Sequence, residues 1–599
     1  MNQNILNKCR KVVKYYRENG GKKFLRHLLA KIFRFDEMSY KRWRKKNVLS
    51  YDQLQKEKDT KFVINPLFSI VVPLFCTPPE YLRDLVESIM AQTYSQWELC
   101  LSDGSGEGKS NINCIKSFLN DPRVKVISSN EPLDISSNTN CALSIARGDY
   151  IAFVDHDDLL EPDALYECVR LINLYPEAEI IYTDEDKVSA DGKQYFQPHF
   201  KSDFNLDLLR SMNYICHLLV LRSDVQKKVG AFQKEFNGAQ DYDFILRSIE
   251  QCSNIYHIPK VLYHWRTHEN STSENPSSKM YAFEAGKHAI ESHLNRVGLK
   301  ATVTMGEYPG LYRVKYHISK EPLVSIIIPN KDHKEDLKRC IESLLNKPGY
   351  KNIEILVAEN NSKSQEIFDY YNELTETYEN IRVLSWTQGA GFNYSALNNF
   401  AAQHSKGEYL LFLNNDTEVI NEGCIREMVS LAVRSDVGAV GARLYYPDGK
   451  IQHAGVILGL GGVAGHAFKD FAHNANGYFS RIICIQDYSA VTAACMMISK
   501  ELFKKIGGFD EKLKVAFNDI DLCMKIREQG LLIVYTPYAE LYHYESKSRG
   551  QEDTKEKIDR FNEEVSYFCN RWNEKLEEGD IYYNPNLTLD KHDFSLKIV

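Results

Sequence analysis

Short apolar runs alternate with amphipathic segments along most of this chain. "FSIVVPLF" (68–75) and "VSIIIPNK" (324–331) are β-branched runs closed by proline, which is typical of buried parallel strands that end at a loop. Each is followed by a segment with helical apolar spacing, "EYLRDLVESIMAQTY" or "KEDLKRCIESLLNKPGY". A second strand with a polar end comes next, "WELCLSDGSG" (97–106) or "IEILVAENNS" (353–362). This alternation predicts an α/β fold with doubly wound, mainly parallel sheets.

The same order of segments occurs twice, which indicates an internal repeat. "NTNCALSIARGDYIAFVDHDD" (138–158) corresponds to "ALNNFAAQHSKGEYLLFLNND" (396–416). Further on, "AQDYDFILR" corresponds to "FNDIDLCMK" (517–525), and "VLYHWRTH" to "ELYHYESK" (540–547). The spacing between matched blocks grows by roughly twenty residues along the chain. We expect the extra residues in the second copy, around "GVILGLGGVAGHAF" (455–468).

The length of 599 residues suggests two to four domains at about 100–200 residues each. The expected divisions are a basic amphipathic helical segment, a first α/β domain, a linker, a second α/β domain, and a C-terminal helix with an irregular tail. Their predicted bounds are 1–60, 61–300, 301–322, 323–550 and 551–599.

Charge and cysteine content narrow the class of protein. A net charge of −7 gives no support to nucleic-acid binding. The fourteen cysteines are scattered singly, which favours reduced thiols in the cytoplasm. The chain begins without the apolar core of a signal peptide and lacks a run of about eighteen apolar residues. These features predict a cytoplasmic protein.

The basic residues are concentrated at the N-terminus. Residues 1–46 hold fifteen Lys or Arg against three acids, and apolar residues recur there at helical spacing. One interpretation is a peripheral anchor on the anionic inner face of the cell membrane. The alternative is a helical hairpin packed on the main body with a solvated basic face.

Acidic residues cluster where a predicted strand of the first copy ends. Asp155, Asp157 and Asp158 follow the apolar run "IAFV". Like charges this close repel unless a cation or a donor lies among them. Carboxylates in a D-x-D pattern are suited to a hard divalent cation, whereas isolated acidic tripeptides are more often solvated or cap a helix. Neither copy has a glycine-rich phosphate loop, so a cation is the expected means of binding a diphosphate.

Other polar residues of the first copy fall at strand ends or helix starts. Asp103 offers an acceptor for a base, or closes an Asx turn. Asp241 offers a general base, or caps a helix. His264 is a candidate metal ligand or diphosphate donor, and Arg266 and His268 are candidate phosphate contacts.

This order of motifs resembles glycosyltransferase family 2. Strand-proline, "SDGS", N-x-A, D-x-D, "QDYD" and "YHWRTH" follow one another as in these inverting enzymes. The resemblance covers about residues 67–275 and 323–550. It implies an α/β protein with two tandem GT-A domains, nucleotide-diphospho-sugar transferase and Rossmann-like in fold, plus the helical N-terminal segment. The tandem arrangement is similar to bacterial rhamnosyltransferase-like proteins that build O-antigen, capsule or rhamnose-rich polysaccharides.

The resemblance also implies roles for individual residues. Asp241 and Asp519 would be the general bases. Asp103, Asn140, Asp155, Arg266, Asn360, Asn398 and Asn414 would contact the nucleotide-sugar. Mg²⁺ or Mn²⁺ would be held by Asp155, Asp157, His264, Asp416 and His543. The implied partners are UDP- or dTDP-sugar donors and a lipid-linked glycan acceptor.

The second copy departs from the first in ways that allow more than one function. We expect Asn360 in place of Asp103, and "NND" (414–416) in place of "DHD". The second site is either active with a different donor or linkage, or degenerate and only holding the acceptor. A protein acceptor such as an adhesin, or a carbohydrate-binding scaffold with dead sites, is also compatible with the motifs. Hydrolysis of glycosides needs paired carboxylates as well, but not a base-reading turn or a metal site.

Overall fold

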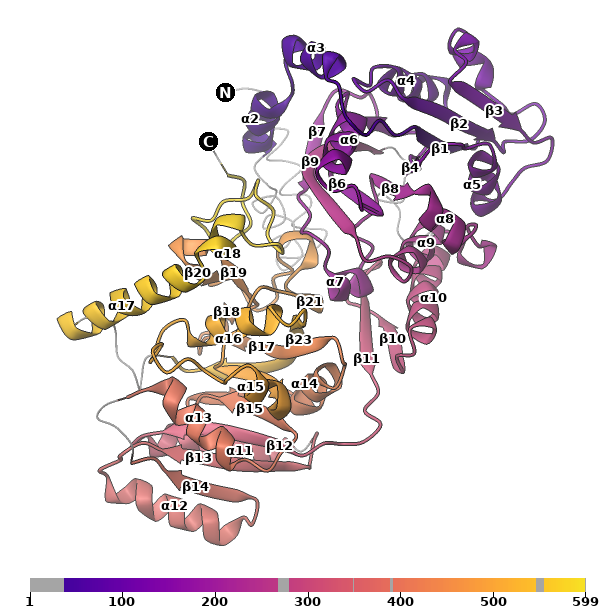
Figure 1. Ribbon diagram of the computed structural model, residues 1–599. Helices are drawn as coiled ribbons and strands as arrows, with labels where there is room; N and C mark the ends of the chain where they lie inside the picture. The colour runs from indigo at the N-terminus through magenta and orange to yellow at the C-terminus, as the bar shows by residue number, and fades with distance from the viewer. Residues whose placement is uncertain (1–36, 268–279, 348, 388–391, 546–553, 598–599) are drawn as a thin grey trace, which may run out of the picture.

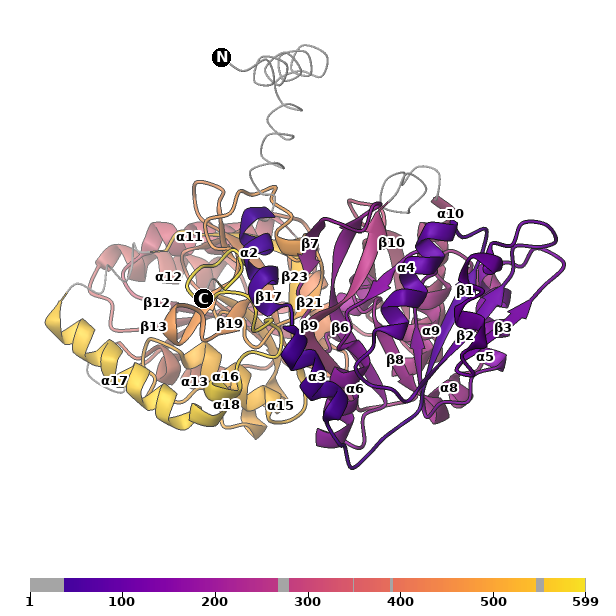
Figure 2. The ribbon, with the colours of Figure 1, turned by 90° about the horizontal axis from the view of Figure 1, so that it is seen from above.

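The computed structural model describes residues 37–597, except 268–279, 348, 388–391 and 546–553. These residues form two lobes, each built on one large sheet (Figure 1). The predicted helices within residues 1–36, and His268, lie outside the described residues. Helices α2 (Glu37–Asn47) and α3 (Tyr51–Asp59) open the described chain, and α2 lies at the junction of the lobes (Figure 2).

The first lobe contains a nine-stranded sheet in the order β3-β2-β1-β4-β8-β6-β9-β5, with β7 paired to β6. Strands β1 to β4 pair in parallel, but β8 is antiparallel to both β4 and β6. The sheet is therefore mixed: most of its paired residues are parallel, as predicted, but the antiparallel β8 was not predicted, because alternating apolar segments do not reveal the direction of a strand inserted between two others. The strands are β1 (Phe68–Leu74), β2 (Trp97–Asp103), β3 (Val124–Ser128), β4 (Tyr150–Phe153), β5 (Leu159–Leu160), β6 (Ile180–Ser189), β7 (Tyr195–His199), β8 (Leu219–Arg222) and β9 (Ile255–Thr267).

The second lobe repeats this order as β14-β13-β12-β15-β22-β17-β23-β16, with β18 on β17 and β21 on β23. The strands are β12 (Val324–Asn330), β13 (Ile353–Glu359), β14 (Ile381–Ser385), β15 (Tyr409–Leu413), β16 (Thr417–Val419), β17 (Val437–Tyr445), β18 (Ile451–His453), β21 (Gln486–Asp487), β22 (Cys495–Ser499) and β23 (Leu532–His543). The predicted repeat is thus confirmed strand by strand.

Both faces of the first sheet are buried, as its continuous apolar strands require. Along β1, Val71 joins a cluster with Ala142 of α5, whereas Ile70 joins a cluster with Leu85 of α4 and Leu165 of α6. Successive side chains therefore face opposite sides of the sheet. The helices of this lobe are α4 (Pro79–Met90), α5 (Ile135–Ser144), α6 (Ala164–Leu174), α7 (Leu206–Ser211), α8 (Ser223–Val229), α9 (Gln240–Ile249) and α10 (Met280–Arg296).

The helices of the second lobe follow the same sequence of positions. They are α11 (Lys334–Asn346), α12 (Gln365–Thr377), α13 (Tyr394–His404), α14 (Cys424–Ala432), α15 (Lys500–Lys505) and α16 (Asn518–Arg527). The charged C-terminal helix is interrupted at Trp572, giving α17 (Lys555–Arg571) and α18 (Asn573–Glu578). Every helix in the described part of the chain is too short or too polar to traverse a lipid bilayer.

The extra residues of the second copy lie where the sequence places them. Ala439 and Ile498 take the sheet positions of Ile180 and Leu221, but the first pair is 59 residues apart and the second pair 41. The longer segment contains the hairpin of β19 (Val456–Leu458) and β20 (Ala464–His466). This hairpin falls within the predicted stretch 455–468.

The two lobes are fastened by buried polar contacts as well as by apolar packing. Arg434 of the second lobe lies 2.6 Å from Asp207 of the first, and both side chains are 2% exposed. Asn205 exchanges hydrogen bonds with the backbone of Asp487, at 2.9 Å each. Between the lobes, residues 301–316 form the hairpin of β10 (Ala301–Met305) and β11 (Tyr312–Tyr316). The C-terminal tail joins this contact, since Asn584 donates hydrogen bonds to Asp184.

Candidate functional site

The acidic turn after β4, residues 154–158, is called here the first tip. Its three carboxylates have different surroundings. The Asp155 side chain is 48% exposed and that of Asp157 is partly exposed, whereas Asp158 is fully buried. Asp158 accepts hydrogen bonds from the Tyr263 hydroxyl at 2.5 Å and from the Arg266 backbone N–H at 2.7 Å. Burial and the charges of Asp157 and Asp155 raise the pKa of Asp158 well above its ordinary value. Asp158 therefore shapes the turn, and the other two acids are the more exposed ones.

His217, just before β8, supplies a positive charge to the first tip. Its Nε2 lies 3.4 Å from Asp155, and its ring stacks on Tyr263 with centroids 5.0 Å apart. Burial opposes the charged ring, but the nearby carboxylates, Asp155 first, raise the pKa of His217 to about 9. Burial works against the Asp155 charge too, yet His217 lowers the pKa of Asp155 overall. The pair is therefore ionised at neutral pH.

Asp241 lies near enough to His217 to act on its charge. It is the second residue of α9, and the Asn213 amide donates a hydrogen bond to it at 3.0 Å. Its charge is among those that raise the pKa of His217 and of Cys216. The structure thus brings the first tip and Asp241 to the neighbourhood of one residue, His217. The sequence interpretation missed His217, since it stands within the apolar run "YICHLLVL" (214–221).

The corresponding turn after β15, residues 414–417, is the second tip. Here Asp416 Oδ1 lies 3.2 Å from His543 Nε2, and the Asn414 amide lies 3.2 Å from the same nitrogen. Gln452 contacts His543 Nδ1 through Oε1 at 2.6 Å, which fixes that nitrogen as the donor. Burial raises the pKa of Asp416, but the hydrogen bond and charge of His543 outweigh it and lower the pKa below its ordinary value.

Asp519, at the start of α16, is held close to the second tip. The backbone N–H of Ala493 donates to it at 3.2 Å, and the neighbouring Ala494 carbonyl accepts the Asn414 N–H at 3.1 Å. Burial raises the pKa of Asp519 above its ordinary value, although hydrogen bonds from Ala493 and Thr492 oppose the shift. A carboxylate with a raised pKa is suited to accept a proton.

A loop before α16 is braced by the C-terminal helix. Glu564 of α17 accepts hydrogen bonds from the backbone N–H groups of residues 514–516, at 2.8–3.1 Å. The Trp572 indole donates to Asp521 at 3.0 Å. The C-terminal helices therefore position the helix that carries Asp519.

Both tips have donor atoms that fit a hard divalent cation. Asp155 and Asp157 offer carboxylate oxygens on partly exposed residues, and Asp416 Oδ1 is buried beside His543 Nε2. Carboxylate oxygens suit Mg²⁺ and Mn²⁺, and an imidazole beside them suits Mn²⁺. Elsewhere in the described chain, Glu57, Asp163 and Glu167 gather three ligand atoms, but Lys260 forms ion pairs with two of these residues.

Comparison with known families establishes the class of the protein. The chain matches the family described as "Glycosyl transferase family 2" over residues 69–229 and 325–507, which is more than half of its length. The chain belongs to glycosyltransferase family 2. The match confirms the predicted family and the tandem α/β organisation. Each matched range begins in the first strand of its sheet and includes one tip.

Relatives of similar sequence are longer than this chain. "O-antigen biosynthesis protein RfbC" of Myxococcus xanthus is 37% identical over 535 residues, covering 89% of this chain and 41% of that protein. "Uncharacterized protein y4gI" of Sinorhizobium fredii is 47% identical over 536 residues, covering 89% of this chain and 58% of that protein. The chain thus spans about half the length of these relatives.

Solved structures of other glycosyltransferases align with part of the chain. The mannosyltransferase PcManGT of Pyrobaculum calidifontis, in complex with GDP-Man and Mn²⁺, is 14% identical with a TM-score of 0.33, covering 49% of this chain and 74% of that one. TarS of S. aureus, in complex with UDP-GlcNAc, is 18% identical with a TM-score of 0.33, covering 39% and 68%.

His264 is not placed as a metal ligand, contrary to the family-based expectation. Its Nδ1 lies 2.6 Å from Asp186 and its Nε2 3.2 Å from Glu161, so both ring nitrogens are occupied by carboxylates. Burial lowers the pKa of His264, but Asp186 and Glu161 raise it to about 9 overall. The ring also contacts Tyr195 of β7, with centroids 4.8 Å apart. His264 is therefore a buried, charged residue between Asp186 and Glu161, on the face of β9 opposite to Tyr263.

Strand pairing shows that His264 and His543 are not equivalent. β9 skips three residues against β6 between Ile258 and Tyr263, and β23 skips three against β17 between Thr536 and Glu540, so both strands advance by the same number of residues. In this register, His264 takes the position of Tyr542, and Trp265 takes that of His543. A shift of one residue moves side chains to the other face of a sheet. The identical letters "LYH" therefore mark different faces in the two lobes.

Arg266 does not present its guanidinium group to a nucleotide. It is 1% exposed and donates to the carbonyl oxygens of Asp157 (2.7 Å) and Ala190 (2.9 Å) and to Asp84 (3.0 Å). Arg266 was expected to contact the nucleotide, but it is a buried residue that braces the protein. By holding the Asp157 backbone, Arg266 fixes the shape of the first tip.

The counterpart of Asp103 is Glu359 rather than Asn360. Asp103 pairs with the last residue of β1, and Glu359 pairs with the last residue of β12. Each accepts a hydrogen bond from the backbone N–H of a nearby serine, Ser105 or Ser362. The Asp103 bond closes an Asx turn. Asn360 occupies the position of Gly104, and its backbone N–H donates to Asn330. A carboxylate therefore ends the second strand in both lobes.

The asparagines of α5 and α13 follow a different register from the expected one. Asn140 exchanges two hydrogen bonds of 2.8 Å with the backbone of Phe232, and Asn399 makes the same pair with Phe509 at 2.9 and 3.0 Å. Asn140 thus matches Asn399, not Asn398, and both are structural. Asn398 is buried and donates to the Tyr394 carbonyl within its own helix. Asn138, not singled out from the sequence, packs under Gly104 at the end of β2.

Proposed function

We propose that the chain carries two inverting glycosyltransferase active sites, one at each tip. The supporting observation is the repeated arrangement of a metal-suited acidic turn beside a carboxylate that opens a helix. In the first lobe, Asp155 and Asp241 both act on the charge of His217. In the second, adjacent backbone groups of Ala493 and Ala494 contact Asp519 and Asn414. A dead scaffold would have no need of either pairing.

In this proposal, an acceptor hydroxyl attacks the anomeric carbon of the donor sugar, and Asp241 or Asp519 removes its proton. Asp103 and Glu359 lie at the ends of β2 and β13. Each contacts the nucleotide base once the hydrogen bond that it accepts from a serine is replaced by one from the base. Asp155 and Asp157 at the first tip, and Asp416 with His543 and Asn414 at the second, would hold Mg²⁺ or Mn²⁺. The cation would neutralise the leaving diphosphate. His217 adds a second positive charge at the first tip.

The proposed substrates are UDP- or dTDP-sugars and a lipid-linked, growing cell-surface glycan such as O-antigen, capsule or rhamnose-rich polysaccharide. The relative described as an O-antigen biosynthesis protein, which this chain matches over 89% of its own length, supports this choice. The basic residues 1–46 support a peripheral location at the inner face of the membrane.

A donor screen with each tip inactivated separately tests the proposal. The full chain, Asp157→Asn and Asp416→Asn would each be supplied with a panel of nucleotide-sugars and a lipid-linked acceptor, and the products analysed by mass spectrometry. We expect the wild type to transfer two sugars or to form two linkages. Each variant should lack one of these two products, and the missing product should differ between the variants. If Asp416→Asn leaves all products unchanged, the second lobe is not catalytic and only holds the acceptor. Products on a protein acceptor alone would overturn the choice of glycan acceptor.

A further inference from the structure

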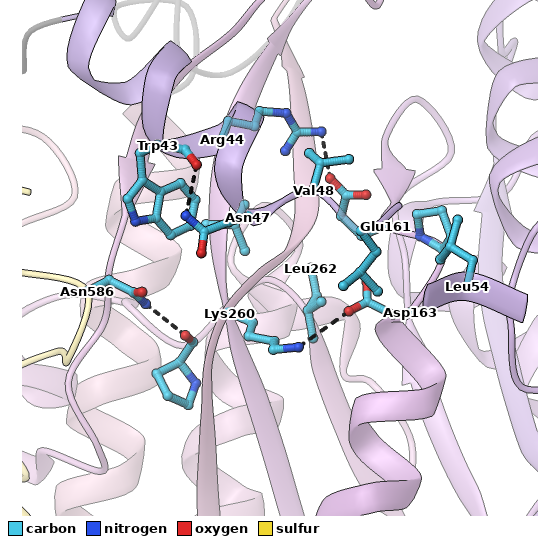
Figure 3. Close-up of a pocket in the computed structure, with 14 residues that line it drawn as sticks. Trp43, Arg44, Asn47, Val48, Leu54, Glu161, Asp163, Lys260, Leu262 and Asn586 are labelled. Carbon is cyan, nitrogen blue, oxygen red and sulfur yellow. Dashed lines mark hydrogen bonds and ion pairs between the residues drawn. The ribbon is translucent and has the colours of Figure 1, made fainter. Parts of the chain in front are cut away.

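A cavity of about 240 Å³ is lined in part by Pro259–Leu262 of β9 (Figure 3). Three distant parts of the chain build it: α2 with the residues after it, the first lobe, and the C-terminal tail. Glu161, three residues beyond Asp158, forms one wall, and Asn586 of the tail forms another. None of these residues takes part in the proposed transfer reaction.

The charged groups around the cavity neutralise one another. Arg44 lies 2.6 Å from Glu161. Lys260 lies 3.6 Å from Asp163 and 2.6 Å from Glu167. A phosphate or a carboxylate would have to compete with these acids for both cations. The cavity is therefore suited to an uncharged ligand.

The cavity also offers hydrogen-bonding atoms that the described protein leaves unused. Asn47 and Asn586 donate through Nδ2 to the carbonyls of Trp43 and Pro259, at 2.8 Å each. Their Oδ1 atoms accept no hydrogen bond from the described residues, and the Trp43 indole N–H donates to none. Figure 3 shows these three side chains around the same space. A donor and two acceptors beside an indole ring and the apolar wall of Leu49, Leu54 and Leu262 match the mixed surface of a sugar ring.

The size of the cavity limits the ligand to a small unit. At about 30 Å³ for each water molecule, its volume corresponds to roughly eight waters. It is below the range of about 300–1,000 Å³ that is usual for drug-sized ligands. A single sugar ring fits this volume better than a complete nucleotide-sugar.

We propose that this cavity binds one neutral sugar residue of a glycan, apart from both donor sites. A role of the cavity in holding the acceptor glycan rests on the proposed function, whereas the binding of a sugar does not. The ligand class follows from the neutral charge balance, the unused donor and acceptors, and the indole ring.

Saturation-transfer NMR with the full chain tests the proposal. The probes are the methyl glycosides of glucose, galactose, mannose, rhamnose and N-acetylglucosamine, each added in the presence of saturating UDP and Mn²⁺ to occupy the tips. We expect at least one glycoside to bind, and Asn47→Ala and Asn586→Ala each to weaken it by about tenfold. Asn65→Ala is the matched control, because Asn65 also donates to a nearby backbone carbonyl but lies outside the cavity.

Trp43→Phe retains an aromatic ring while removing the indole N–H, and should also weaken binding with little effect on the fold. Far-UV circular dichroism confirms that each variant is folded. Absence of binding by all five glycosides would overturn the proposal, as would binding that the three cavity variants leave unchanged. If transfer is absent but binding remains sensitive to these variants, the cavity inference stands and the proposed function fails.

Discussion

The two tips differ in where their histidine comes from. At the first tip, His217 before β8 pairs with Asp155, the first acid of the turn. At the second, His543 at the end of β23 pairs with Asp416, which matches the later acid, Asp157. The strand position of His543 is taken by Trp265 in the first lobe. Two copies of one fold therefore place an imidazole beside a tip carboxylate by different routes.

This difference teaches that the position of a strand is retained more strictly than the identity of the residue on it. The corner before the fourth strand is the same in both lobes: Gly148 and Gly407 donate their N–H groups to Ser69 and Ser325, at 2.7 and 2.8 Å. A Cβ at either glycine would lie 2.6 Å from the backbone of the first strand. By contrast, the letters "LYH" stand one position earlier on β9 than on β23, and this single step puts the two histidines on opposite faces.

The largest expected effect comes from the two proposed bases. Asp241→Asn should lower the rate of the first linkage by about 10²–10⁴-fold, and Asp519→Asn the second by a similar factor, since each removes a proton acceptor. The rates are measured separately from the amounts of the two products. Asp243→Asn, next to Asp241 but buried and paired with Arg247, is the control for helix damage. Loss of both products in one base variant would contradict two independent sites.

His264 should contribute to stability rather than to metal binding. Its pKa is raised to about 9, so its ion pairs are fully present below pH 6.5 and are lost as the pH rises through 9. Over this interval the wild type should lose about 3 kcal/mol more of its free energy of unfolding than His264→Gln. Urea denaturation at pH 6 and pH 9.5 measures the difference. Equal losses in the two proteins would show that His264 is not charged at pH 6.

His543→Gln and His264→Gln should separate the two histidines by metal affinity. Because His543 lies at a tip and His264 does not, His543→Gln should weaken Mn²⁺ binding at the second tip by about 10–100-fold. His264→Gln should leave Mn²⁺ binding unchanged. Isothermal titration calorimetry with Mn²⁺ gives both values, and a loss of affinity in His264→Gln would refute its assignment to the opposite face.

The smallest expected effect concerns the ends of the second strands. Glu359→Gln should raise the dissociation constant for the second donor nucleotide by about tenfold, because a charged acceptor at the base is lost. Asn360→Ala should change it little, since Asn360 contacts the end of β12 through its backbone N–H. Fluorescence titration with each nucleotide tests this pair. The reverse ranking would restore Asn360 as the counterpart of Asp103.

The sequence allowed prediction of the features that depend on local pattern. The repeated strands, the glycine corners, the place of the insertion, and the positions of Asp155, Asp157, Asp241, Asp416 and Asp519 follow from the repeat, from apolar periodicity and from polar residues at strand ends. The antiparallel direction of β8 and β22 could not be predicted, because an apolar run does not indicate the direction of its strand. The one-residue offset of "LYH" between the two strands was also hidden, since the repeated letters favour an alignment of the two histidines.

His217 and the bracing role of Arg266 illustrate a second limit. Both depend on contacts between residues far apart in sequence, such as Arg266 with Asp84 and His217 with Asp155. A motif assigns a type of residue to a role, whereas burial and the partners of each nitrogen decide whether that role is available. Arg266 and His264 carry suitable groups, but their donors are already occupied within the protein.

The central claim, that each lobe holds its own nucleotide and metal site, is tested most directly by the stoichiometry of Mn²⁺ binding in the presence of UDP. Electron paramagnetic resonance of the full chain counts bound Mn²⁺. We expect two bound ions in the wild type, one in Asp157→Asn, one in Asp416→Asn, and none in the double variant. A single ion in the wild type, lost in one variant and unaffected in the other, would contradict the account.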